Sequence, residues 1–233
     1  MDLIYPPGCL ACDARVLERG GLCPECWRET AFVRGLGCDL CGAPLPGESD
    51  RAEVCDDCRA ARRPWRQGRA ALLYAGAGRR MVLGLKHGDR LDLAAPCAAW
   101  MAARAVGMAL DGAVVVPVPL HWRRHVRRRG NQAAALAAPL ARRLGLPLAP
   151  DLLRRVRATA PLDGVTPAER EGRLKGAIAA HSGRAARWAG RPVLLVDDVM
   201  TSGATLAACA RACREGGLGE ARVLTLARVV KDA

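Results

Sequence analysis

Two adjacent acids, Asp197 and Asp198, follow a short apolar run and precede a loop of small and hydroxyl residues. The run at residues 192–196 has the composition of a buried strand, and residues 203–215 have that of a helix ending at a Gly-Gly pair. Such a strand would hold both carboxylates at the carboxyl edge of a parallel sheet, where ligands bind. The loop at residues 201–205 would present backbone N–H groups at a helix N-terminus, which favours phosphate.

The loop itself has the side chains that a phosphate site needs. Gly203 lets the backbone approach a ligand closely, and Thr201, Ser202 and Thr205 add hydroxyl donors. An ordinary strand–turn–helix connection is the alternative interpretation. That alternative gives no reason for the two neighbouring acids, which repel each other when they have no partner.

Residues 193–206 resemble the phosphoribosyl-pyrophosphate (PRPP) binding signature of type I phosphoribosyltransferases. The resemblance implies that Asp197 and Asp198 are the catalytic residues and hold the ribose hydroxyls, with Mg²⁺ accompanying PRPP. It assigns the 5′-phosphate to Thr201, Ser202, Gly203, Ala204 and Thr205. Purine-salvage members carry a carboxylate, proposed as general base, where Thr201 stands here. A base such as hypoxanthine is therefore not the expected acceptor.

Eight of the eleven cysteines form four Cys-x-x-Cys pairs within residues 1–64. Each pair can aim two sulfurs at one metal ion, and two pairs complete a tetrahedral zinc site with no open position for a catalytic water. We therefore expect two structural zinc ions. The first two pairs would form one site and the last two the other, and an interleaved pairing is the alternative. The expected ligands are Cys9, Cys12, Cys23, Cys26, Cys38, Cys41, Cys55 and Cys58.

A basic stretch follows the apolar run at residues 113–118. Five arginines within seven residues suit pyrophosphate or a nucleic-acid backbone, and a solvated loop in an arginine-rich chain is the alternative. Trp122 in the same stretch would stack on a base. With Lys86 added, the expected contacts to pyrophosphate or nucleic acid are Lys86, Arg123, Arg124, Arg127, Arg128 and Arg129.

The whole chain resembles the ComF family, whose members are linked to DNA uptake in natural transformation. The resemblance rests on the cysteine pairs and the PRPP segment, and on short motifs at residues 85–89, 116–120, 128–132, 159–161 and 169–177, in this order. The usual Arg-Gly-Phe-Asn-Gln motif lacks its Phe here, and Leu162 and Arg173 replace a usual Gln and Asn. These departures concern contacts on the expected acceptor side and leave the PRPP loop intact.

Two functions agree with this resemblance. The first is a protein that binds PRPP with Mg²⁺ and transfers its phosphoribosyl group by displacing pyrophosphate, with residues 158–173 as a hood over the site. The second is a phosphoribosyltransferase fold that binds single-stranded DNA and performs little or no transfer. The resemblance alone also implies docking of a DNA-uptake helicase on the zinc ribbon.

The remaining pattern places these residues in a fold. Apolar runs at residues 70–74, 113–118, 192–196 and 222–230 alternate with helical stretches at residues 91–110, 132–144 and 203–215. This alternation predicts an α/β fold, a parallel sheet flanked by helices as in type I phosphoribosyltransferases, at residues 65–233. A small double zinc ribbon would occupy residues 1–64.

Composition narrows the setting of the protein. The formal net charge is +13, and all but three of the 36 basic residues are arginines. The charge stays positive when eight thiolates and two zinc ions are counted, so phosphates are attracted in general. No signal segment begins the chain, and Pro96 and Arg104 interrupt its most apolar long stretch. We expect a cytoplasmic protein without membrane insertion, where cysteines stay reduced. Cys97, Cys209 and Cys213 then read as core residues.

Overall fold

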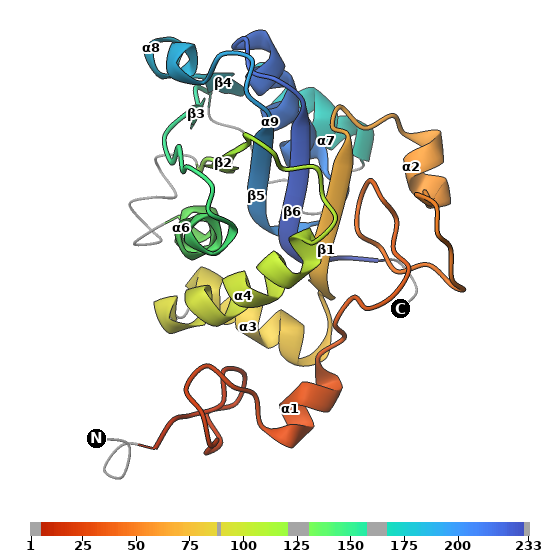
Figure 1. The fold of residues 1–233 in the computed structure, drawn as a ribbon, viewed down its shortest axis with the longest axis vertical. Helices are drawn as coiled ribbons and strands as arrows, with labels where there is room; N and C mark the ends of the chain where they lie inside the picture. The colour runs from red at the N-terminus through yellow and green to blue at the C-terminus, as the bar shows by residue number, and fades with distance from the viewer. Residues whose placement is uncertain (1–5, 88–89, 121–130, 158–166, 231–233) are drawn as a thin grey trace.

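The computed structural model describes residues 6–87, 90–120, 131–157 and 167–230. At its centre lies a four-stranded parallel sheet in the order β1-β6-β5-β2 (Figure 1). Its strands are β1 (Gln67–Leu73), β2 (Val114–Pro117), β5 (Val193–Met200) and β6 (Ala221–Arg228). A separate antiparallel pair joins β3 (Leu153–Arg155) to β4 (Ile178–Ala180). The predicted parallel α/β fold is confirmed.

Strand β5 is central because it has neighbours on both sides. It pairs with β6 from Val193 to Met200, and with β2 only as far as Val196. Val193, Leu194, Leu195 and Val196 are fully buried, as expected for a strand of a parallel sheet covered on both faces. The predicted strand at residues 192–196 ends too early, since the ladder with β6 carries the strand through the two acids.

Helices cover both faces of this sheet (Figure 1). One face packs against α3 (Gly76–His87), α4 (Ala94–Ala105) and α6 (Gln132–Leu144), and the other packs against α9 (Ala204–Glu215). The shorter elements are α1 (Pro24–Glu29), α2 (Asp56–Ala60), η1 (Leu91–Leu93), α7 (Pro167–Leu174), α8 (Ser182–Ala185) and η2 (Ala186–Trp188). None of the helices in these ranges is long and apolar enough to cross a membrane.

The two cysteine-rich segments pack in different places. The first lies against α3, where Cys9, Cys23 and Cys26 form a small cluster with Ala77, and Figure 1 shows α1 beside that helix. The second packs on the opposite face of the sheet, in the core that contains α9. Between them, the backbone at residues 31–33 hydrogen-bonds to β1. The domain boundary after residue 64 stays a prediction. The cysteine-rich segments before it pack against the domain after it on both faces of the sheet.

Candidate functional site

Asp197 and Asp198 lie in the second half of β5, beyond the point where β2 stops pairing. The backbone N–H of Asp198 donates to Asp197 Oδ1 at 2.9 Å. On the other side, Lys86 Nζ at the end of α3 lies 3.3 Å from Asp198 Oδ2, and both side chains are mostly buried. A cation from a separate helix therefore compensates one acid of the pair directly.

Burial raises the pKa of Asp197 well above its ordinary value, and the neighbouring charge of Asp198 raises it further. The nearby cation Lys86 and the hydrogen bond from the Asp198 backbone oppose this rise. An acid held in this way loses its proton reluctantly until a cation or a set of donors arrives. The site is thus prepared for a ligand that brings positive charge or hydroxyl groups to Asp197.

The loop after β5 leads directly into α9. Gly203 is the N-cap residue of α9, with a φ of 80°, and it provides no side-chain cap. The Ser202 hydroxyl accepts from the Ala204 N–H at 3.4 Å. A twelve-residue helix that begins without a strong cap presents the partial positive charge of its first turn to the space beside the acids. This arrangement is suited to an anion.

Two arginines hold the carbonyl side of the same loop. Arg228 Nη1, at the end of β6, donates to the Thr201 carbonyl at 2.7 Å and to the Met200 carbonyl at 3.2 Å. Arg63 Nη1 donates to the Ser202 carbonyl at 2.7 Å. Three successive carbonyl groups thus point toward guanidinium groups. This orientation leaves the N–H side of the loop for an anion, with positive charge behind it.

The eight paired cysteines form two tetrads. In each one the four sulfurs lie within 4.8 Å of one another, in the sets Cys9, Cys12, Cys23, Cys26 and Cys38, Cys41, Cys55, Cys58. The Sγ–Sγ distance is 3.7 Å between Cys12 and Cys23 and also between Cys41 and Cys55. A tetrahedron with zinc–sulfur distances near 2.3 Å has edges of about 3.8 Å. Both tetrads therefore fit a zinc ion, the sequential pairing is confirmed, and the interleaved alternative is wrong.

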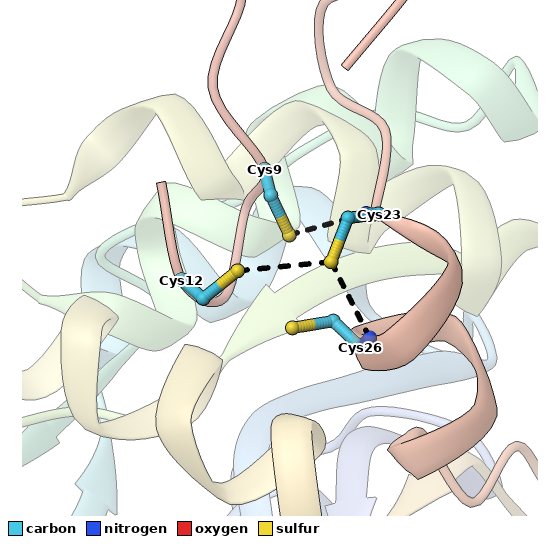
Figure 2. A group of neighbouring side chains, drawn as sticks. All are labelled: Cys9, Cys12, Cys23 and Cys26. Carbon is cyan, nitrogen blue, oxygen red and sulfur yellow. Dashed lines mark hydrogen bonds between the residues drawn. The ribbon is translucent and has the colours of Figure 1, made fainter. Parts of the chain in front are cut away.

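Figure 2 shows the first tetrad, whose sulfurs converge from a loop and from the start of α1. The backbone N–H groups of Cys23 and Cys26 donate to the sulfurs of Cys9 and Cys23, at 3.3 Å and 3.5 Å. In the second tetrad the Cys55 N–H donates to Cys38 Sγ at 3.4 Å. Such N–H donors stabilise thiolates, which is the form that binds zinc.

The three cysteines outside the tetrads are fully buried core residues, as predicted. Burial raises the pKa of both Cys97 and Cys213 to about 12. For Cys209 the pKa is raised well above its ordinary value, first by burial and then by the charges of Cys213 and Asp197. All three thiols thus stay protonated, so they serve packing rather than metal binding or nucleophilic chemistry.

Some predicted contacts lie outside the described residues. These are Trp122 and the arginines at positions 123, 124, 127, 128 and 129, and most of the expected hood at residues 158–173, of which α7 is described. Of the predicted cationic contacts, Lys86 is placed at the acids. Sequence reasoning missed Arg63 and Arg228. The signal for Arg228 was present, since charged residues are unusual in the apolar run of the final strand, where Arg222 is the other one.

Comparison with known proteins agrees with this architecture. The double zinc ribbon domain family matches residues 1–59, and the phosphoribosyl transferase domain family matches residues 122–232. The DNA utilization protein YhgH of Salmonella typhimurium is 31% identical over 98% of this chain and 100% of its own. Competence protein F of Haemophilus influenzae is 36% identical over 49% of each chain. A solved structure described as the allosteric regulatory enzyme of purine biosynthesis covers 62% of this chain and 30% of its own, at 21% identity and a TM-score of 0.39.

The fold and the tetrads define a class of protein in which a double zinc ribbon precedes a phosphoribosyltransferase domain. Full-length similarity to YhgH and partial similarity to competence protein F narrow this class further. The chain belongs to the ComF family.

Proposed function

We propose that the chain binds PRPP together with Mg²⁺ at Asp197, Asp198 and the loop at residues 201–205. One observation carries this proposal: a partly buried pair of acids lies beside an arginine-backed loop at the start of α9. The loop amides would hold the 5′-phosphate, and the two carboxylates would hold the ribose hydroxyls. Lys86, which lies 3.3 Å from Asp198, would contact the pyrophosphate.

The chemistry that this site supports is displacement of pyrophosphate at the anomeric carbon of the ribose. Mg²⁺ would supply charge neutralisation on the leaving group. The protein's own contribution is positioning and electrostatic stabilisation. Thr201 provides no carboxylate base, so the acceptor has to be nucleophilic without one. Incubation with PRPP, Mg²⁺ and a panel of bases and nucleic acids, followed by pyrophosphate detection, identifies the acceptor class.

The binding proposal is tested by the double substitution Asp197→Asn/Asp198→Asn. Wild-type protein should bind PRPP in the presence of Mg²⁺ by isothermal titration calorimetry, and the double variant should give no binding heat. Asp50→Asn/Asp111→Asn is the control, because it removes the same charge from two exposed positions. Unchanged binding by the Asp197/Asp198 variant would overturn the proposal.

A second function, binding of single-stranded DNA in the cytoplasm during DNA uptake, is supported by the DNA-related names of the relatives and by the charge of +13. Docking of a DNA-uptake helicase on the zinc ribbon is supported by the resemblance to the ComF family alone. Cytoplasmic location is supported by the cysteine chemistry, because two thiolate tetrads require a reducing compartment. The fold would then serve as a DNA-binding module, with or without transfer chemistry.

The DNA proposal is tested through salt dependence. Replacing Arg127, Arg128 and Arg129 by Ala should lower the slope of log affinity against log salt by about 0.7 for each lost phosphate contact. Arg142→Ala/Arg143→Ala/Arg187→Ala removes the same charge from exposed helical positions and should leave the slope unchanged. Equal slopes for the wild type and for the variant that lacks Arg127, Arg128 and Arg129 would reject this segment as the contact.

A further inference from the structure

Arg63 joins the second cysteine tetrad to the loop beside the acid pair. Its Nε donates to Cys58 Sγ at 3.4 Å, and its Nη1 donates to the Ser202 carbonyl at 2.7 Å. Cys58 and Ser202 are far apart in sequence, and one guanidinium group contacts both. Because the guanidinium is planar and its donors are fixed relative to one another, a displacement of Cys58 is transmitted to the Ser202 carbonyl.

Trp65 makes a second connection between the same two places. Its indole N–H donates to the Leu40 carbonyl at 2.7 Å, and Leu40 lies between the tetrad ligands Cys38 and Cys41. A side-chain carbon placed on Gly203 would lie 3.1 Å from the Trp65 ring and 3.1 Å from Arg63 Nη1. Arg63 also lies over the Trp65 ring, with its guanidinium carbon 5.5 Å from the centroid. Both residues therefore fix the backbone of the loop at Gly203.

The first tetrad has a matching arginine contact that leads elsewhere. Arg80 Nη2 donates to Cys26 Sγ at 3.3 Å and to Glu29 at 2.6 Å. Both of these contacts lie in the surroundings of the first tetrad. The Arg80 side chain is 44% exposed, whereas Trp65 beside Arg63 is 5% exposed. Arg80 is therefore the natural control for Arg63: the same residue type donates to a tetrad sulfur in both cases.

We propose that the second tetrad controls the position of the phosphate-binding loop through Arg63, so that affinity for a phosphorylated ligand depends on metal at this tetrad. Arg63 is a positioning residue in this arrangement. The inference rests on the proposed function, because it takes the loop at residues 201–205 to be the phosphate contact. It goes beyond it by giving the second zinc ion a role in ligand binding.

The physical basis is a charged acceptor. Four thiolates around one Zn²⁺ carry net negative charge, so Cys58 Sγ holds the Arg63 guanidinium by a charge-assisted hydrogen bond. The metal also fixes the turn at Leu40 that orients Trp65. Without the metal, Arg63 and Trp65 would no longer be held in place, and the loop at residues 201–205 would lose both of these contacts. Coupling of this kind is reciprocal, so a ligand on the loop must in turn retain the metal at the second tetrad.

The first measurement compares Arg63→Gln, Arg63→Lys and Arg80→Gln. We expect Arg63→Gln to weaken PRPP binding in Mg²⁺ by about tenfold, within the usual range of coupling between two sites. Arg63→Lys should restore part of this loss, since an ammonium reaches only one of the two acceptors well. Arg80→Gln should bind PRPP as the wild type does. Zinc content of two per chain and a cooperative melt establish that each variant is folded.

The second measurement is one that a purely structural role of Arg63 would not affect. Zinc release to a chromogenic chelator is followed with and without PRPP and Mg²⁺. In the wild type and in Arg80→Gln, PRPP should slow the release of one of the two zinc ions. In Arg63→Gln, PRPP should slow the release of neither ion.

Each outcome has a definite meaning. PRPP binding that is equal in wild type and Arg63→Gln, or zinc release that ignores PRPP in a wild type that binds it, overturns the inference and leaves the proposed function standing. A wild type that fails to bind PRPP overturns the proposed function and this inference with it. Weaker binding by Arg63→Gln together with lost protection of one zinc ion supports the coupling.

Discussion

At the scale of single residues, the position of Asp197 disfavours the ionised form of its carboxyl. Burial raises the pKa of this carboxyl, and the charge of the neighbouring Asp198 raises it further. The backbone N–H of Asp198 and the nearby charge of Lys86 oppose this rise. A residue that is unfavourable for the folded chain on its own is characteristic of a functional position.

We therefore predict that Asp197→Asn stabilises the protein in the absence of ligand at pH 7. In the unfolded chain Asp197 loses its proton above its ordinary pKa near 3.8, while the folded chain retains the proton to higher pH. Wild-type stability thus falls as pH rises, by up to about 1.4 kcal/mol per pH unit within that window. Asn does not titrate, so its advantage should grow above pH 4 and vanish below it.

Thermal unfolding between pH 3.5 and pH 7.5 measures this difference directly. Asp111→Asn, at an exposed position, is the control and should follow the wild type across the range. A variant Asp197→Asn that melts below the wild type at pH 7 would contradict the expectation. The same variant should bind PRPP worse than the wild type, which separates its effect on stability from its effect on binding.

At the scale of elements, the sequence identified the strand and helix of the site but not their exact extent. Two acids in succession are typical of a strand end, so the predicted strand stopped at residue 196. In the structure β5 continues to Met200, because β6 pairs with it from Val193 through Met200. A ladder partner that lies further along the chain is invisible to a local pattern.

Helix α3 was missed for a related reason. Gly76, Gly78 and Gly84 lower its helix propensity, and the helix forms because Met81 and Val82 pack into the core below the sheet. Gly78 is needed for that packing, since a side chain there would come within 2.8 Å of Leu72. Lys86 could be singled out from the sequence, whereas the helix that places it beside Asp198 could not.

At the scale of the whole molecule, the two tetrads differ in how they pack: the second shares a buried core with the sheet, and the first does not. Cys38, Cys41 and Cys58 belong to the same buried core as β5 and α9, together with Trp65. Cys9, Cys23 and Cys26 form a separate small cluster with Ala77 of α3. The second tetrad is thus part of the support of the phosphoribosyltransferase core, whereas the first is attached to the outside of a helix that covers it.

This difference predicts unequal consequences for two matched substitutions, Cys41→Ser and Cys9→Ser, both at fully buried ligand positions. Each should remove one zinc ion, because a tetrad that has lost a thiolate binds zinc much more weakly. Cys41→Ser should also loosen the core beneath β5 and α9. A difference of about 3 kcal/mol between the two variants would separate their melting midpoints by roughly 6–12 °C in a chain of this size.

Circular dichroism melts, with zinc content measured on the same samples, decide the point. Cys9→Ser should keep one cooperative transition close to that of the wild type, because the sheet, α4, α6 and α9 retain their contacts. Cys41→Ser should melt in a single transition well below that of Cys9→Ser, because its tetrad and the sheet share one core. Equal midpoints for the two variants would mean that the second tetrad is as peripheral as the first, and its contacts to Trp65 and Arg63 would then contribute little to the stability of the core.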